Sequence, residues 1–411
     1  MNRRIPLARP FVATLLVFVV GCQLGPERLR VANSHYSEAV RIATAEQLLA
    51  NLVRLRYRDG AMFLAVTNIS TQFEFNTALD VNGTIVNQGG SDSVGIGGGI
   101  SYSEKPTISF SIMGGETFQK RILRPLGISA ISLLADSGWR GDRLLRLTTE
   151  SMNGLGNAPT ASGPTPSTAP DYERFLEATR LLHELRVGGL IDFDHVTRRS
   201  KLSAPLPRAS IGASETVSAL EAGVAFERVD DDLVQLYAET RRLVLRLSRT
   251  AGASAKVARL RELLHLDESR SVYDVVELAA SDFDPLDPEK RLSTIGIDTR
   301  SLMGVLYYIS NGVEVPEEDL ASGVVSRTVD AEGNPFEWSS LLGGLFAVRS
   351  SEDRRRPPGA ALAIQHRGHW FFIPDDDLSS RSTFLLLGEL FTLLSGDVGE
   401  ARPVLTLPVG G

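Results

Sequence analysis

The chain has 411 residues, of which 43% are hydrophobic and 23% charged, and its formal net charge is −7. Residues 1–21 contain three arginines and no acidic residue, so residues 22–411 hold 40 basic and 50 acidic residues, a net charge of −10. Such an acidic body is not typical of nucleic-acid-binding proteins, and we expect no nucleic-acid partner. The single cysteine excludes disulfides within the chain and zinc sites built on several cysteines. A mature length of 390 residues fits two domains.

The N-terminus has the three parts of a secretory signal peptide. Three arginines precede the apolar run 11–20, and the small residue Gly21 follows it. This run has about half of the roughly 20 residues that a membrane-spanning helix needs. We therefore predict that residues 1–21 are a cleavable signal peptide, with a transmembrane anchor as the weaker interpretation.

The sequence Val19-Val20-Gly21-Cys22 resembles the lipobox of bacterial lipoproteins. The resemblance implies cleavage before Cys22, with lipid on its sulfur and on the new amino terminus, so a membrane is the first partner that we expect. Gln23 stands where an aspartate is associated with retention in the inner membrane, which implies an outer-membrane location facing the periplasm. Residues 22–32 would then be a short tether. The alternative is an ordinary signal peptide followed by a chance cysteine.

Residues 33–157 are predicted to form an N-terminal α+β domain. Thr44 and Gln47 match a capping box, and leucines at helical spacing follow until Asp59-Gly60 ends the pattern. Three arginines lie in the last turns of this predicted helix, where cations favour the helix dipole: Arg54, Arg56 and Arg58. Their alternative role is to contact an anionic ligand.

Two stretches of this predicted domain alternate between apolar and polar residues, as strands with one buried face do. The first covers residues 69–82 and ends at the turn signal Asn82-Gly83. The second covers 93–113 and is interrupted at Glu104-Lys105-Pro106, so we predict that it forms a hairpin by itself and packs on soluble protein. The alternative is that these glycine-rich hairpins from several copies form an export channel.

Residues 158–170 are rich in proline, serine and threonine and are predicted to be a linker to a second α+β domain, residues 171–411. In this second domain Asp298 is expected to cap a helix. Residues 361–365 and 370–373 are predicted to be strands, and residues 384–394, apolar on nearly every side, a buried helix. The predicted fold class is thus α+β, with antiparallel hairpins and packed amphipathic helices in two domains.

The best candidates for metal binding or acid/base chemistry are His366 and His369, with Asp375 nearby. Two imidazoles three residues apart across a turn could approach each other, and a carboxylate could complete the set. The simpler interpretation, which we favour, is a turn made by Arg367-Gly368 and aspartates that cap the next helix. The chain has no P-loop, zincin motif or nucleophile elbow, and we expect no bound metal or cofactor.

Two segments, Glu46–Asp59 and His366–Leu387, are similar to an uncharacterised group of bacterial envelope proteins, for which no activity is known. The leading hypothesis is a lipid-anchored, non-enzymatic component that binds or assembles an envelope complex with other envelope proteins. The second is a lipid-anchored hydrolase or metal enzyme acting on an envelope polymer. The third is a homo-oligomeric export channel.

Overall fold

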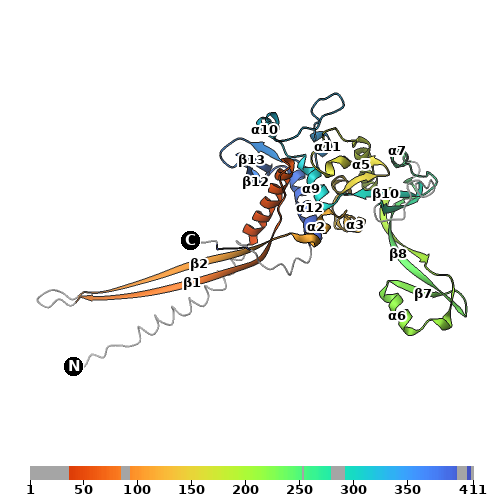
Figure 1. Ribbon diagram of the computed structural model, residues 1–411, viewed down its shortest axis with the longest axis horizontal. Coiled ribbons are helices and arrows are strands. Elements are labelled where there is room, and N and C mark those ends of the chain that lie inside the picture. The colour runs from red at the N-terminus through yellow and green to blue at the C-terminus, as the bar shows by residue number, and fades with distance from the viewer. Residues whose placement is uncertain (1–36, 85–92, 252–253, 279–291, 396–404, 409–411) are drawn as a thin grey trace.

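The chain folds into helices packed on mainly antiparallel sheets, which confirms the α+β class. The computed structural model describes residues 37–84, 93–251, 254–278, 292–395 and 405–408. The predicted signal peptide, Cys22 and the predicted tether lie outside the described residues. A body carries two long projections, which we call the ribbon and the arm (Figure 1). In the described part of the chain, no helix combines the length and the apolar character required to cross a membrane.

One core of the body lies between helices and the largest sheet. The order of this sheet is β4-β3-β10-β9-β8-β5, with β6 and β7 also paired to β8, and only the β9–β10 pair is parallel. Its strands are β3 (Thr149–Met152), β4 (Leu155–Gly156), β5 (Ile191–Lys201), β6 (Leu206–Pro207), β7 (Val224–Arg228), β8 (Leu233–Leu247), β9 (Val272–Glu277) and β10 (Thr294–Thr299). Helices α5 (Glu173–Val187) and α7 (Ala255–Leu264) cover it with buried side chains such as Phe175 and Leu260.

A second core joins residues from both predicted domains. It contains Leu49 and Leu144 together with Leu306, Phe371 and Leu387. It is formed by the N-terminal helix (residues 37–56), by α2 (Gly115–Leu123), α3 (Ile128–Asp136), α4 (Gly141–Thr148), α9 (Leu302–Ser310) and α12 (Leu378–Ser395), and by the sheet β11 (Arg349–Ser351), β13 (His369–Pro374) and β12 (Ala360–His366). Short helices complete the body: η1 (Pro159–Ser162), α10 (Glu317–Ala321) and α11 (Ser339–Leu342), whereas η2 (Arg208–Ser210) follows β6.

The predicted linker of residues 158–170 is packed into the body. Ala158 and Ala161 are fully buried, and Thr168 forms a β-bridge with Val329. Small side chains and the prolines let this segment pass between helices, which its composition alone did not reveal. Because the segment and the core on both sides of it are continuous, the division into two domains is not confirmed.

Arg300 fastens this segment to the sheet. Its guanidinium is fully buried and donates to the carbonyl oxygens of Thr149 and Asn157, and its Nε lies 3.1 Å from Ser162 Oγ. The group also stacks over the Tyr308 ring, with 3.9 Å between Cζ and the ring centroid. Burial lowers the pKa of Arg300 to about 10. Carbonyl dipoles and a π face therefore solvate this cation in place of water.

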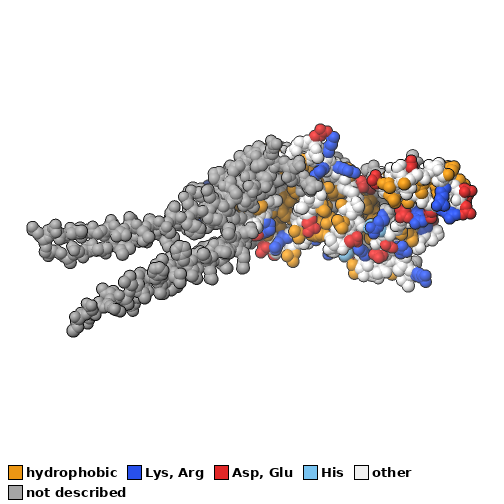
Figure 2. All heavy atoms as spheres, turned by 90° about the horizontal axis from the view of Figure 1, so that it is seen from below, with side chains coloured by type: hydrophobic (Ala, Val, Ile, Leu, Met, Phe, Trp, Pro, Cys, Tyr) orange, Lys and Arg blue, Asp and Glu red, His pale blue; other side chains and the backbone are white. Residues whose placement is uncertain are grey.

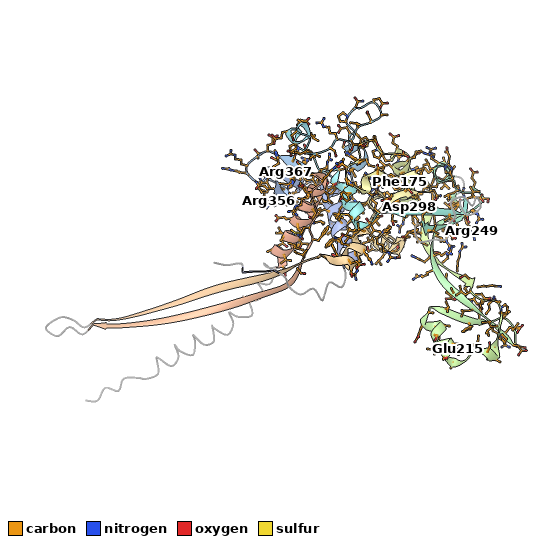
Figure 3. All side chains as sticks on the ribbon, viewed as in Figure 1. Phe175, Glu215, Arg249, Asp298, Arg356 and Arg367 are labelled. Carbon is orange, nitrogen blue, oxygen red and sulfur yellow. The ribbon has the colours of Figure 1, made fainter. Side chains whose placement is uncertain are left out.

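The ribbon consists of β1 (Leu64–Thr84) and β2 (Ser93–Ile112), antiparallel over their whole length. At about 3.3 Å per residue, 20 paired residues span roughly 65 Å, and Figure 1 shows the ribbon extending away from the body. The strand β14 (Leu405–Pro408) pairs with residues 107–110 of β2, close to the body. The arm consists of β5, β6, β7, β8 and the helix α6 (Ala213–Glu221), and Glu215 of α6 lies in its outer part, away from the body (Figure 3).

Several predicted elements differ from the structure. The N-terminal helix is already helical at residue 37, so Thr44 lies in its interior and the predicted capping box is wrong. Residues 93–112 form one unbroken strand whose partner is β1, so the predicted hairpin within 93–113 is also wrong. Asp298 belongs to β10, and Ser301 caps α9 through its side chain instead. Each of these predictions rested on a short stretch of sequence, whereas helix extension or strand pairing beyond that stretch determines the structure.

Candidate functional site

The structure does not bring Asp375 to the two histidines. His366 and His369 are opposite each other at the turn between β12 and β13, whereas Asp375 follows the other end of β13. There Asp375 Oδ1 lies 2.9 Å from Arg381 Nη1. Among the described residues, no cluster of three or more His, Cys, Asp or Glu side chains is arranged to hold a metal ion. The two predicted histidines and Asp375 are therefore not one site.

Each histidine instead contacts a separate carboxylate. His366 Nε2 lies 3.4 Å from Asp59 Oδ2, and its ring meets that of Tyr57 edge to face at 5.0 Å. Burial lowers the pKa of His366, and this outweighs the opposing effect of Asp59. His369 Nε2 lies 2.7 Å from Glu318 Oε1. The first contact fastens the end of the N-terminal helix to the β12–β13 turn, and the second fastens that turn to α10.

Tyr57 is the centre of this junction. Its hydroxyl donates to Asp319 Oδ2 at 2.6 Å, and Arg367 Cζ lies 5.2 Å from its ring centroid. Burial, followed by the bond to Asp319, raises the pKa of Tyr57 well above its usual value. Figure 3 shows Arg367 in the part of the body where the N-terminal helix ends. The segments Glu46–Asp59 and His366–Leu387 thus meet here.

The three arginines near the end of the N-terminal helix have different surroundings. Arg56 is buried, and its Nη1 donates to Thr165 Oγ1 at 2.9 Å and to the Ser326 carbonyl at 3.3 Å. Burial lowers the pKa of Arg56 to about 10. Arg58 has a left-handed backbone with φ 60° and donates to Ser326 Oγ at 3.1 Å, while Arg54 is half-buried. Arg56 and Arg58 therefore bind the protein's own loops, which is a structural role.

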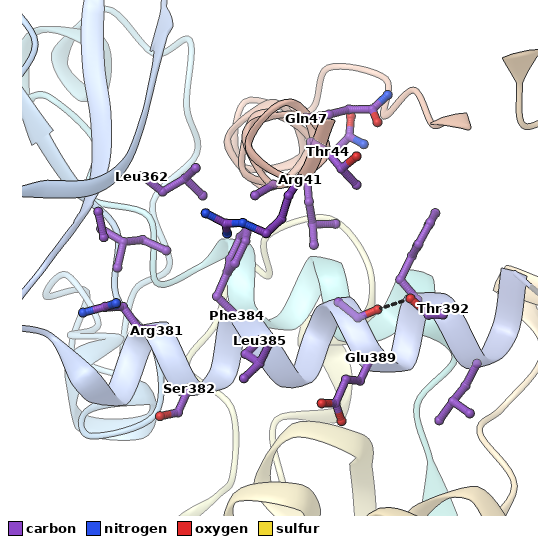
Figure 4. Close-up of a pocket in the computed structure, with 18 of the residues that line it drawn as sticks. Arg41, Thr44, Gln47, Leu362, Arg381, Ser382, Phe384, Leu385, Glu389 and Thr392 are labelled. Carbon is purple, nitrogen blue, oxygen red and sulfur yellow. Dashed lines mark hydrogen bonds between the residues drawn. The ribbon is translucent and has the colours of Figure 1, made fainter. Parts of the chain in front are cut away.

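A groove of about 1160 Å³ separates the N-terminal helix from α12 (Figure 4). Its floor is apolar, with Leu48, Leu362 and Phe384 among its lining residues. Three charged residues of the groove have partners: Arg41 Nε donates to Glu38 at 2.8 Å, Arg381 pairs with Asp375, and Glu389 accepts from Trp139 Nε1 at 2.8 Å. The groove suits an apolar occupant.

The sequence predicted α12 to be buried on nearly every side, and this is wrong. Leu386, Leu387 and Leu390 are buried, but Leu385 is 60% exposed and Leu393 47% exposed. Both exposed leucines line the groove. Apolar character all round a helix signals burial, and here it also marks a surface that the described chain leaves uncovered.

The ribbon has a rigid root in the body. Asn51 of the N-terminal helix donates to the Met62 carbonyl at 2.8 Å and accepts from the Met62 amide at 3.0 Å, which fixes the chain as it enters β1. The next residue, Phe63, is buried, stacks on Phe391 of α12 at 5.5 Å and accepts a backbone bond from Met113. The direction in which the ribbon leaves the body is therefore set by core packing.

Apolar and polar residues alternate along both β1 and β2, and the register of the two strands arranges them in two rows, one on each face of the ribbon. Directly opposite residues of an antiparallel pair share a face, and the pairs of the first row are Ile69–Ile108, Thr71–Pro106, Phe73–Glu104, Phe75–Tyr102, Thr77–Ile100, Leu79–Gly98, Val81–Ile96 and Gly83–Val94. The pairs of the second row are Ser70–Thr107, Gln72–Lys105, Glu74–Ser103, Asn76–Ser101, Ala78–Gly99, Asp80–Gly97 and Asn82–Gly95. The first, which we call the apolar row, is mainly hydrophobic. The second, the polar row, contains only small or polar residues.

Exposed apolar side chains also lie where the ribbon joins the body. Ile112, the last residue of β2, is 60% exposed, and Leu123 at the end of α2 is 58% exposed. Leu133 of α3 is equally exposed and lines the groove. Figure 2 shows hydrophobic side chains on the body close to this junction. The base of the ribbon is thus continuous with an apolar surface of the body.

These features define the ribbon, its base and the groove as the candidate functional site. The amino-acid sequence indicated only part of this site. The alternation in both strands was visible, but the pairing of β1 with β2 and its register were not. Comparisons with protein-family models, with curated proteins and with solved structures find no match to this chain.

Proposed function

We propose that the protein is a non-enzymatic component of the bacterial cell envelope, anchored by lipid on Cys22, which assembles with its partners through the ribbon. The observation that carries this proposal is the ribbon itself, whose apolar row continues the exposed apolar surface at its base. A row of apolar residues along a ribbon that extends away from the body is a typical sign of an interaction surface. The root formed by Asn51 and Phe63 holds it in one direction, as an assembly element requires.

The anchor and the ribbon fit one arrangement. Fourteen residues, 23–36, separate the predicted lipid on Cys22 from the described N-terminal helix, and the chain continues from that helix through Phe63 into β1. Lipidation contributes about 0.8 kcal/mol per buried methylene, so several acyl chains would keep the base of the ribbon near a membrane. An outer-membrane location, with the body in the periplasm, is part of this proposal.

The enzyme hypothesis has less support from the geometry. Asp375 lies away from His366 and His369, and each of the two histidines already contacts a carboxylate that fastens helix to sheet. The arrangement around them stabilises the end of the N-terminal helix. We therefore propose no reaction for this protein.

A cross-linking experiment tests the proposal. A photo-reactive amino acid is placed at Thr77 in the ribbon and, as a matched control, at Thr197 in the arm, and cells are irradiated before membranes are isolated. We expect adducts with copies of the chain or with another envelope protein from Thr77 and none from Thr197. The Cys22→Ser variant should lose its fatty-acid label and leave the membrane fraction. A ribbon that gives no adduct, in a protein that is lipidated and folded, would overturn the proposed function.

A further inference from the structure

The outer part of the ribbon has a length that matches a lipid bilayer. We call residues 73–84 and 93–104 the distal half. From Val94 to Tyr102 the apolar row of β2 continues for nine residues, with Ile96, Gly98 and Ile100 at the positions between. A strand that crosses the hydrocarbon of a bilayer needs about 9–11 residues. The apolar part of the distal half therefore just spans that thickness.

The residues at the inner end of this stretch are those expected at a membrane surface. The register groups Phe73, Phe75 and Tyr102 at two successive positions of the apolar row, and Glu104 follows opposite Phe73. Aromatic residues border the apolar band of membrane-spanning strands, and charges lie beyond it in water. The order apolar, aromatic, charged thus runs along the ribbon toward the body.

The polar row of the distal half is suited to water. In this row Asn76 lies opposite Ser101, and β2 contributes the three glycines Gly95, Gly97 and Gly99. No large apolar residue occupies this row between Asn76 and Asn82. One face for hydrocarbon and one for water, at period two, is the pattern of strands that line an aqueous path through a bilayer.

The backbone of the distal half requires further copies if it is to enter lipid. β14 pairs only with residues 107–110, so within the described residues both outer edges of the distal half have no strand beside them. Unpaired backbone groups cost several kcal/mol each in hydrocarbon, so open edges are not tolerated there. Ribbons from several copies, paired edge to edge in a closed ring, would satisfy all these groups.

Building on the proposed function, we infer that the distal half of the ribbon inserts into a lipid bilayer as part of such a homo-oligomeric ring. The apolar row faces lipid, and the polar row faces a water-filled channel. The bodies remain outside the membrane, held at its surface by the lipid on Cys22. Asp80 and Glu74 are in the polar row, so the channel should favour cations over anions.

The first test measures the surroundings of each row. Single cysteines are introduced at Ile96, Ile100, Gly97 and Ser101, in the full lipidated chain, and carry an environment-sensitive dye in vesicles of phosphatidylethanolamine and phosphatidylglycerol. The dyes at Ile96 and Ile100 should be quenched by a lipid-soluble quencher, and those at Gly97 and Ser101 by a water-soluble one. A cysteine at Val196 in the arm is the control and should respond only to the water-soluble quencher.

The second test measures conduction across planar bilayers of the same lipids. In a potassium chloride gradient we expect a reversal potential on the cation-selective side, which Asp80→Asn combined with Glu74→Gln shifts toward zero. Ile100→Arg should lower the number of conducting assemblies at least about tenfold, because arginine on the lipid side of a strand resists insertion near the bilayer centre. Asn76→Arg, its matched control in the polar row, should still insert. An unchanged unfolding transition establishes that both variants fold.

The outcomes separate this inference from the proposed function. If both rows respond only to the water-soluble quencher and no conduction occurs, insertion is wrong, while adducts at Thr77 would still support assembly through the ribbon. If the dyes at Ile96 and Ile100 are shielded from both quenchers and Thr77 links to a different protein, the apolar row docks on that protein, and the inference is also overturned. Absence of any adduct would remove the proposed function itself.

Discussion

The ribbon and the arm are both antiparallel projections from one body, but their charges differ. In the arm, opposite charges join neighbouring strands: Arg199 Nε lies 2.7 Å from Glu239 and Arg246 Nη2 lies 3.0 Å from Asp194. In the ribbon, one row is polar and the other mainly apolar. The arm thus presents paired charges to water, whereas the ribbon gathers its apolar residues on one face.

The two projections also differ in how their edges are paired. Along β8, β5 and β6 occupy one side, and β7 and β9 the other. In the ribbon, apart from β14 near the base, each strand has only the other as its partner in the described residues. Of the arm strands, only β8 has both edges paired, since β5 and β7 each leave an outer edge open within the described residues, and an open edge is a template for pairing with another chain. The comparison therefore predicts assembly through the ribbon because the apolar residues of the ribbon share one face.

The largest effect that tests this difference between the ribbon and the arm is expected on the free energy of unfolding. Leu245, at the root of the arm, is fully buried, and Leu245→Ala should lower the free energy of unfolding by about 2–5 kcal/mol. If the apolar row is free of the body, as proposed, Ile108→Ala in the ribbon should change it by less than about 0.5 kcal/mol in water. Denaturant titration of the non-lipidated Cys22→Ser form measures both. Equal losses would mean that the ribbon packs on the body and is not free to engage a partner.

A smaller effect on the free energy of unfolding is expected near the end of the N-terminal helix, which leads into the ribbon. Arg56→Met removes the donors to Thr165 and Ser326 and should lower the free energy of unfolding by about 1–3 kcal/mol. Arg54→Met, in the half-buried neighbour on the same helix, should cost no more than about 0.5 kcal/mol. The same titration distinguishes the two. If Arg56→Met were neutral for stability but weakened binding to anionic vesicles, the anion-contact hypothesis would replace the structural one.

The ion pairs of the arm should contribute least among the contacts of the two projections. Arg199→Ala removes pairs with Glu239 and Glu227, all half-exposed, and should lower stability by less than about 1 kcal/mol. Salt at about 1 M screens such pairs and should reduce the difference further. Thermal unfolding at low and high salt measures this. A larger loss that survives high salt would show that the arm depends on these pairs.

The sequence predicted the class of the fold because period and turn chemistry are local. The predicted strands 361–365 and 370–373 appear as β12 and β13. Local signals therefore sufficed wherever the partner was also close in sequence.

What could not be predicted depends on distant partners. Pairing of Phe75 with Tyr102 follows from a register that one alternating stretch cannot specify, because shifting it by two residues keeps the same faces. The burial of Arg300 among carbonyls gives no pattern in sequence, and a composition like that of residues 158–170 resembles an unstructured linker. For the candidate site, the sequence shows the alternation of apolar and polar residues in each strand. It does not show that pairing of β1 with β2 combines them into two rows.

The weakest effect concerns His366, which lies at the junction that holds the helix leading into the ribbon. Its pKa is lowered in the folded chain, first by burial and also by Arg367 and Arg54, while Asp59 and Asp319 act in the opposite direction. A histidine with a lowered pKa is held neutral, so its contribution to stability is complete above the unfolded pKa of about 6.5 and declines as the pH falls below it. Unfolding measured between pH 8 and pH 5 should show this decline, and His366→Phe, which keeps an aromatic ring against Tyr57, should reduce it. If the decline in stability is the same in both proteins, other groups cause it, and the junction around Tyr57 and His366 is insensitive to pH.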